Sequence, residues 1–134
     1  MKLLVDTSVW SLALRRDHPP DLPEVSTLAR ALEGGELVVT TGLIVQEILQ
    51  GFRGPSTRDR ILARFGTLPL LSPDLEDHVE AAALRILCRR RGVQTGTIDA
   101  LIARLCIRHG LTLLTTDEDF RRMAEHSPLQ LWKE

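Results

Sequence analysis

The chain has 134 residues, of which 43% are apolar, and a formal net charge of −1 at pH 7. This length and apolar content suit one hydrophobic core, so we predict that residues 1–134 form a single domain. The near-neutral charge excludes a protein that binds nucleic acid or a membrane surface through its overall charge, and any such binding has to be local.

The first half of the chain alternates short apolar runs with helical patterns, and glycines or prolines separate them. The predicted elements are a strand at 3–5, a helix at 9–14, a turn-rich loop at 17–23, a helix at 24–33, a strand at 37–40, helices at 43–52 and 56–65, and a short edge strand at 68–71. We expect Ser56 to cap the helix that it begins, because serine is a preferred N-cap residue.

The second half continues this alternation, with glycines after the longer helices. The predicted elements are helices at 74–91 and 97–109, a strand at 111–114, a helix at 118–126 and a last strand at 129–132. Asp74 and Thr97 are the expected N-caps of the two longer helices. The first of these helices has the pattern of an amphipathic helix. Its apolar residues at helical spacing are Leu75, Val79, Ala82 and Ile86.

Short strands that alternate with helices imply βαβ units. They predict an α/β domain with a mainly parallel central sheet of four to five strands, flanked by helices. In such sheets, ligands bind beyond the carboxyl ends of the strands. Asp6 and Asp117 both lie just past the end of a predicted strand, so this edge of the sheet is the first place to look for a site.

The sequence gives little support for export from the cell, for a membrane span or for a structural zinc site. Asp6 interrupts the apolar start before the core of a signal peptide could form, and no apolar run reaches the length of a membrane span. Cys88 and Cys106 lie in apolar helical patterns without the spacing of zinc ligands, so we predict reduced thiols in the core. We therefore expect a soluble, cytoplasmic protein without a membrane partner.

Four acidic residues lack an obvious local partner: Asp6, Glu47, Asp99 and Asp117. An unpaired carboxylate next to a core strand is costly, although Asp6 could instead hydrogen-bond the start of the following helix. Glu47 has no basic residue three or four positions away, and its alternative is a solvated position on the outer face of its helix. Each residue alone therefore allows a structural interpretation as well as a functional one.

The other two carboxylates have similar alternatives. Asp99 in the first turn of a helix could serve only to stabilise the helix dipole. Asp117 could cap the following short helix, and Arg121 lies four residues further on. Asp119, with Arg122 three residues later, is more ambiguous still.

A parallel sheet would bring these four residues to one crevice, where like charges repel one another. Hard divalent cations neutralise such a cluster, and Mg²⁺ or Mn²⁺ prefers oxygen ligands of this kind. A site of this type suits hydrolysis of a phosphodiester by a metal-activated water. It needs no histidine as a base, and we interpret His18, His78, His109 and His126 as surface residues.

With these residues assembled, the chain resembles PIN-domain proteins, and in particular the VapC-type ribonuclease toxins of toxin-antitoxin modules. Four segments carry the resemblance in order: VDTSVW at 5–10, IVQEILQG at 44–51, TIDALIA at 97–103 and LLTTDEDF at 113–120. The resemblance covers essentially the whole chain. It implies a PIN-like three-layer fold, a Mg²⁺- or Mn²⁺-dependent endoribonuclease acting on RNA, a homodimer, and a cognate antitoxin that covers the site.

The resemblance also assigns roles to individual positions. The acidic quartet that binds metal and performs catalysis would be Asp6, Glu47, Asp99 and Asp117. Ser8 and Thr115 would support the site by hydrogen bonding, and Asp119 would contact a second metal or a water. Basic residues after the Glu47 helix become candidate phosphate contacts for RNA, with solvated helix faces as the alternative. These residues are Arg53, Arg58, Arg60 and Arg64, and Arg89 to Arg91 form a second basic run.

Two other functions compete with this interpretation. A phosphotransfer domain also places an aspartate after the first strand, but Ser8 stands where the haloacid-dehalogenase pattern has a second aspartate, and no Walker A loop occurs. A non-catalytic PIN-like module is the alternative from another class. Such a module would bind RNA or protein, and its carboxylates would hold a metal for stability or meet the arginines of a partner.

Overall fold

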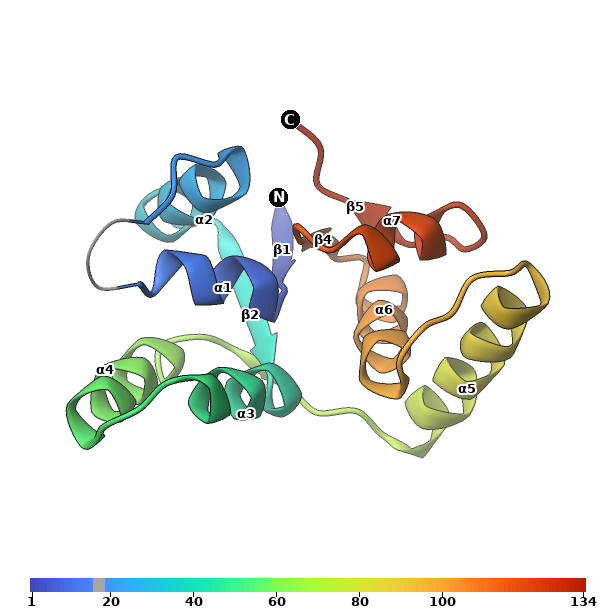
Figure 1. Cartoon of the computed structure of the whole chain (residues 1–134), viewed down its shortest axis with the longest axis horizontal. Coiled ribbons are helices and arrows are strands. Elements are labelled where there is room, and N and C mark those ends of the chain that lie inside the picture. The colour runs from blue at the N-terminus through green and yellow to red at the C-terminus, as the bar shows by residue number, and fades with distance from the viewer. Residues whose placement is uncertain (16–18) are drawn as a thin grey trace.

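A computed structural model describes residues 1–15 and 19–134. Its five strands form one parallel sheet in the order β3-β2-β1-β4-β5 (Figure 1). The strands are β1 (Lys2–Val5), β2 (Leu37–Thr41), β3 (Leu70–Leu71), β4 (Thr112–Leu114) and β5 (Gln130–Leu131). Both edge strands, β3 and β5, have only two residues. The prediction of an α/β domain with a parallel sheet is confirmed.

Helices cover both faces of this sheet, which gives three layers. Figure 1 shows α1 and α2 on one side of the sheet and α6 and α7 on the other, with α5 outermost. The helices are α1 (Thr7–Ala13), α2 (Pro23–Glu33), α3 (Gly42–Gly51), α4 (Pro55–Phe65), α5 (Leu75–Arg90), α6 (Thr97–His109) and α7 (Glu118–Ala124). None of the described helices is long and apolar enough to cross a membrane.

The expected caps of α4 and α6 were wrong by one or two residues. Gly54 is the N-cap of α4, at a φ of 91° that favours glycine, and Ser56 lies inside the helix. Pro55 explains the shift, because its fixed φ suits the first position of a helix. Thr97 is the first helical residue of α6, and Gly96 is the N-cap. Asp74 does cap α5, as predicted.

The core lies between the sheet and its helices, and both cysteines belong to it as free thiols. Burial raises the pKa of Cys88. Burial and, to a lesser degree, the charge of Asp6 raise the pKa of Cys106 to about 12. His78 and His109 are exposed and His126 is half-buried. His18 and the first positions of the predicted loop at 17–23 lie outside the described residues.

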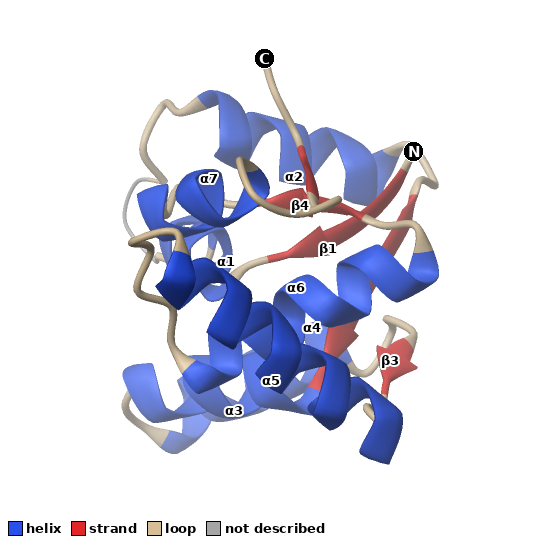
Figure 2. Cartoon of the chain, turned by 90° about the vertical axis from the view of Figure 1, so that its right-hand side faces the viewer, coloured by secondary structure: helices blue, strands red, loops and turns tan. Residues whose placement is uncertain are grey.

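The apolar face of α5 is exposed, contrary to what an amphipathic helix on a core would show. Leu75, Val79 and Ile86 are 79%, 57% and 45% exposed. The residues of α5 that are buried are Asp77, Ala81 and Cys88. Figure 2 shows α5 nearest the viewer, with its outer face uncovered. A charged anchor, rather than the apolar stripe, therefore sets how α5 is turned on its neighbour α6.

That anchor is the carboxylate of Asp77, which is fully buried. It accepts a hydrogen bond from Arg104 Nε at 3.1 Å and one from Arg108 Nη1 at 2.7 Å, both on α6. It also accepts from the backbone N–H of Asp74, which closes a capping box at the start of α5. Burial alone would raise the pKa of Asp77, but these hydrogen bonds and the charge of Arg108 outweigh it and hold the pKa at about 2.

Candidate active site

Asp6 stands at the carboxyl end of β1, at the centre of the sheet. Its backbone N–H donates to the carbonyl of Leu114 at 2.9 Å, so the end of β1 is tied to the end of β4. Its side chain is buried and accepts from Ser8 Oγ at 2.7 Å and from Thr115 Oγ1 at 2.8 Å. Asp6 occupies the N-cap position of α1, but its side chain forms no hydrogen bond with the backbone of that helix. The alternative that Asp6 hydrogen-bonds the start of the helix is therefore wrong.

Ser8 and Thr115 extend this contact into a network that joins two distant segments. Their hydroxyl oxygens are 3.3 Å apart. The backbone N–H of Thr116 donates to Ser8 Oγ at 3.1 Å, and that of Asp117 donates to Thr115 Oγ1 at 3.0 Å. The loop after β4 is therefore held against the start of α1, and this fixes the position of Asp117 relative to Asp6.

Asp117 caps α7, as one alternative for this residue proposed. Its Oδ1 accepts from the backbone N–H of Asp119 at 2.9 Å. Arg121, however, pairs with Glu118 at 2.7 Å and leaves Asp117 without a cation. Asp119 has only a long contact of 3.5 Å with Arg122, between exposed side chains.

Asp99 lies in the first turn of α6 and faces the other carboxylates. Carboxylate oxygens of Asp99, Asp117 and Asp119 all lie within 4.8 Å of one another. Burial and then the negative charges of the neighbouring carboxylates raise the pKa of Asp99 to about 6. The contributing residues, in order of decreasing effect, are Asp6, Asp117, Glu47 and Asp119. Asp99, Asp117 and Asp119 thus form one close group, and Asp6 and Glu47 lie outside it but near enough for their charges to act on Asp99. We call these five residues the carboxylate cluster.

Glu47 is half-buried on α3 rather than fully solvated. Burial raises its pKa, the hydrogen bond from Thr7 opposes this, and the charge of Asp6 raises it further. Thr7 Oγ1 donates to Glu47 Oε1 at 3.2 Å, which links α1 to α3. The sequence analysis did not identify Thr7 as a site residue. Its place directly after Asp6 was the available signal, but the contact depends on how α1 and α3 approach each other.

The composition of this cluster fits a hard divalent cation. Its side-chain donors are carboxylate oxygens, with hydroxyls behind them, and this is the ligand set of Mg²⁺ or Mn²⁺ rather than of zinc. Among residues 1–15 and 19–134, no lysine or arginine forms an ion pair with Asp6, Glu47, Asp99 or Asp117. Neighbouring negative charges contribute to the raised pKa of Asp99 and of Glu47, and a bound cation would relieve this repulsion.

The candidate phosphate-binding arginines do not form part of this cluster. All four are exposed. Arg60 donates to the carbonyl of Leu14 at 3.3 Å, at the end of α1 opposite to Asp6. Arg60 and Arg64 both line a hollow against Leu14 and Thr67. The structure therefore places Arg60 and Arg64 beside the far end of α1, and their predicted contact with RNA remains a prediction.

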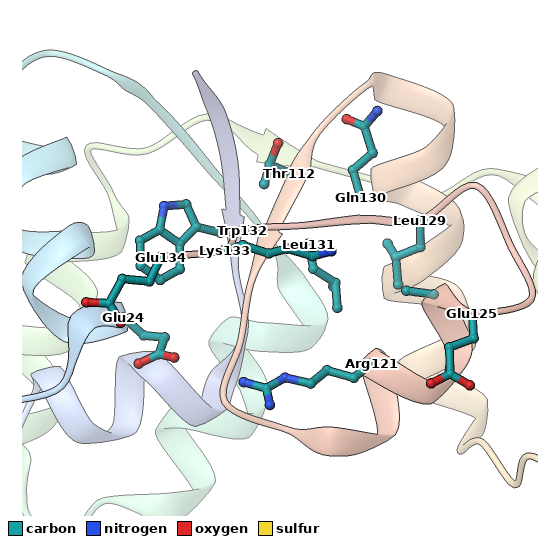
Figure 3. Close-up of a pocket in the computed structure, with 11 residues that line it drawn as sticks. Glu24, Thr112, Arg121, Glu125, Leu129, Gln130, Leu131, Trp132, Lys133 and Glu134 are labelled. Carbon is teal, nitrogen blue, oxygen red and sulfur yellow. The ribbon is translucent and has the colours of Figure 1, made fainter.

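A cavity of about 880 Å³ lies elsewhere, beside β5 and α7 (Figure 3). Trp132 and Glu24 line one side of it, and Arg121 and Glu125 line another. Its lining includes none of the five clustered carboxylates. The carboxylates lie outside this cavity, where Asp6 and Asp117 follow the carboxyl ends of the neighbouring strands β1 and β4.

Comparison with known proteins shows the family to which the chain belongs. The PIN domain family model matches residues 3–126. The chain is 32% identical to "Ribonuclease VapC11" of Mycobacterium tuberculosis over 130 residues, which is 96% of both chains. It is 31% identical to "Ribonuclease VapC23" of the same organism, over 85% of this chain and 90% of that one.

A solved structure shows the same fold. The structure of VapBC2 from Rickettsia felis, bound to a DNA fragment from its promoter, contains a chain that matches with a TM-score of 0.76. That match has 19% identity and covers 99% of this chain and 100% of the other. The chain described here belongs to the PIN domain family, as a homologue of the VapC ribonucleases.

Proposed function

We propose that this protein is a Mg²⁺- or Mn²⁺-dependent endoribonuclease that acts as the toxin of a VapBC-type pair. The observation that carries the proposal is the close group of Asp99, Asp117 and Asp119, whose carboxylate oxygens lie within 4.8 Å of one another. Burial and then the charges of Asp6, Asp117, Glu47 and Asp119 raise the pKa of Asp99 to about 6. Asp6, Glu47, Asp99 and Asp117 have no cationic partner in the described part of the chain. Homology to proteins named ribonucleases supports RNA as the substrate.

In this proposal the four carboxylates hold the cation, and Asp119 contacts a second cation or a water. When bound, Mg²⁺ or Mn²⁺ would orient a phosphate, lower the pKa of a water and offset negative charge in the transition state. Ser8 and Thr115 hold one oxygen of Asp6 through two short hydrogen bonds. The N-cap contact of Asp117 fixes the fourth carboxylate in the same way.

The antitoxin partner is part of the same proposal. The solved structures with the same fold include VapBC of Rickettsia felis and of Salmonella typhimurium, and FitAB. A toxin with an open acidic site needs a partner that keeps it inactive during normal growth. We therefore propose that a cognate antitoxin binds this chain and covers the carboxylates.

The direct test compares the wild type with Asp6→Asn on mixed RNA, after metal removal and with or without Mn²⁺. We expect cleavage only by the wild type with Mn²⁺. The loss in the variant should reach at least about 100-fold, because metal-assisted stabilisation is worth several kcal/mol. In cells, the wild type alone should arrest growth and Asp6→Asn should not. Cleavage without metal, or equal cleavage by both proteins, would contradict the mechanism.

The non-catalytic module remains the alternative function. It predicts that no RNA in the mixture is cleaved with Mg²⁺ or Mn²⁺, although the metal still raises the melting temperature of the wild type. Such a result, together with unimpaired growth at confirmed soluble levels, would favour the module over the nuclease.

Thr7→Val gives a second expected result, because it removes the hydroxyl that donates to Glu47 and keeps the shape of the side chain. One such hydrogen bond is worth about 1 kcal/mol, so we expect Mn²⁺ affinity to fall about 3- to 10-fold. Titration calorimetry with Mn²⁺ measures the change. Thr7→Ser is the control, since it keeps the hydroxyl and should bind like the wild type. Equal Mn²⁺ affinity in all three proteins would show that Thr7 does not contribute to metal binding.

A further inference from the structure

Asp99 differs from the other three carboxylates of the proposed metal site in how it is held. Hydrogen bonds from hydroxyls or backbone N–H groups hold the carboxylates of Asp6, Glu47 and Asp117. Among residues 1–15 and 19–134, no hydrogen bond or ion pair reaches the carboxylate of Asp99. Its place in the site therefore depends on the backbone from which it projects, which is the first turn of α6.

The segment that joins α5 to α6 has few hydrogen bonds of its own (Figure 1). Val93 still bonds back to the end of α5, where its N–H donates to the carbonyl of Cys88 at 2.8 Å. Gly96 is the N-cap of α6, and its carbonyl accepts from the N–H of Ala100 at 3.0 Å. Between these two points, in the described part of the chain, residues 94 and 95 take part in no backbone-to-backbone hydrogen bond. The segment therefore relies on side-chain contacts for its path.

Arg85 of α5 supplies such a contact. Its Nε donates to the carbonyl of Thr95 at 2.8 Å, and within the described ranges this is the only side-chain hydrogen bond that residues 94 and 95 receive. Arg85 is half-buried and lines a groove beside the first turn of α6, together with Thr97 and Ala100. Thr95 is buried, so water competes little for its carbonyl. A guanidinium that donates to a carbonyl makes a charge-assisted hydrogen bond, which is stronger than a neutral one.

The carbonyl of Thr95 lies one residue before the N-cap, and the N-cap lies next to Asp99. A Cβ added to Gly96 would come within 3.9 Å of Asp99 Oδ2, so the backbone of Gly96 is an immediate neighbour of this carboxylate. A shift of the peptide between Thr95 and Gly96 would therefore move the first turn of α6 together with the carboxylate that projects from it. Metal affinity is sensitive to such shifts, because the groups that orient a ligand determine how well it meets the cation.

We propose that Arg85 is a positioning residue of the metal site. Through the carbonyl of Thr95 it fixes where α6 begins, and so it keeps Asp99 beside Asp117 and Asp119, as a shared cation requires. This inference rests on the proposed function, because it takes Asp99 as a metal ligand. In the part of the chain that the structure describes, Arg85 forms no hydrogen bond or ion pair with any member of the carboxylate cluster. Its effect on the site is therefore indirect.

The first test asks whether Arg85 holds the start of α6 in the metal-free protein. Arg85→Met removes the donor and keeps most of the apolar stem. We expect the backbone order parameters of residues 95–99, measured by nuclear magnetic resonance relaxation, to fall from about 0.85 towards about 0.6, while those of residues 103–107 stay unchanged. A general loss of stability would not produce this local difference. Unchanged values at 95–99, or an equal fall along the whole of α6, would overturn the proposal.

The second test measures Mn²⁺ affinity by titration calorimetry. Loss of a group that orients a metal ligand lowers metal affinity about 10- to 100-fold, so we expect Arg85→Met to bind Mn²⁺ at least about 10-fold more weakly. Arg89→Met is the matched control. Arg89 is exposed, lies one turn further along α5 in the same groove, and has no hydrogen bond or ion pair with residues 1–15 or 19–134. This control loses the same charge and should bind like the wild type. Unchanged affinity in Arg85→Met, or an equal loss in the control, would overturn the proposal.

The kinetics of RNA cleavage separate positioning of Asp99 from direct contact with RNA. At a Mn²⁺ concentration near the Kd of the wild type, Arg85→Met should lower kcat at least about fivefold and leave KM within about threefold. A rise in KM with unchanged kcat would make Arg85 a phosphate contact and would contradict the proposal. If the wild type cleaves no RNA, the proposed function fails, whereas the order parameters and the Mn²⁺ affinity still decide the role of Arg85.

Discussion

Asp99→Asn should abolish RNA cleavage and at the same time make the metal-free protein more stable. Burial of this carboxyl, and then the negative charges of four other carboxylates, raise its pKa to about 6. In the proposed site it holds the cation, so its loss should lower the rate by at least about 1,000-fold if metal assistance is worth 4 kcal/mol or more. Asparagine keeps the volume of the side chain and removes the charge, which relieves the repulsion in the absence of metal.

The gain in stability should depend on pH in a defined direction. A carboxyl whose pKa is raised in the folded state favours folding when it is protonated, so this contribution is lost as pH rises from about 4 through 6. The wild type and Asp99→Asn should therefore have the same free energy of unfolding near pH 4, and the variant should be the more stable protein at pH 7. Because the side chain is half-buried, screening by solvent limits the expected difference to about 1 kcal/mol in free energy of unfolding.

Urea unfolding in the presence of a chelator measures this difference, and single-turnover cleavage measures the activity. Glu118→Gln is the matched control, because this exposed carboxylate pairs with Arg121 outside the cluster and should change neither quantity by much. A large loss of stability in Asp99→Asn without metal would contradict the proposal. It would instead support the interpretation of Asp99 as a helix-dipole residue.

Asp77→Asn should lower the free energy of unfolding by about 3 kcal/mol, because it breaks a buried ion pair on one side. The carboxylate is fully buried and joins α5 to Arg104 and Arg108 of α6. An amide cannot accept charge-assisted hydrogen bonds of the same strength, and it leaves both arginines without their closest anion.

The loss of stability caused by Asp77→Asn should also depend on pH. The pKa of Asp77 is held at about 2, below its value in an unfolded chain, so its contribution is present above pH 4 and is lost as pH falls towards 2. The two unfolding curves should converge in acid. Asp74→Asn is the control, since asparagine is also a good N-cap and Asp74 is exposed. A change below about 1 kcal/mol for Asp77→Asn would show that α5 does not depend on this anchor.

Much of the fold could be predicted from local patterns. Apolar runs of strand length alternate with helical spacing, and that alternation already implied parallel strands with helices on both faces. The parallel topology also predicted where the site lies. The carboxyl ends of β1 and β4 lie side by side and place Asp6 near Asp117. Glu47 and Asp99 could be suggested because neither has a basic residue three or four positions away in the sequence.

Other features depend on tertiary contacts that no local pattern contains. Asp77 looks like an ordinary first-turn acid in the sequence, yet it is buried and turns the apolar stripe of α5 outward. The contact of Thr7 with Glu47 requires the packing of α1 against α3. Ser56 satisfied the rule for a helix cap, but Pro55 and Gly54 moved the start of α4.

The shortness of the two edge strands has a consequence for behaviour in a crowded cell. Strands of two residues, as in β3 and β5, offer few free backbone groups to a strand from another molecule. The sheet is thereby protected against edge-to-edge growth into aggregates, a hazard for proteins with exposed edges.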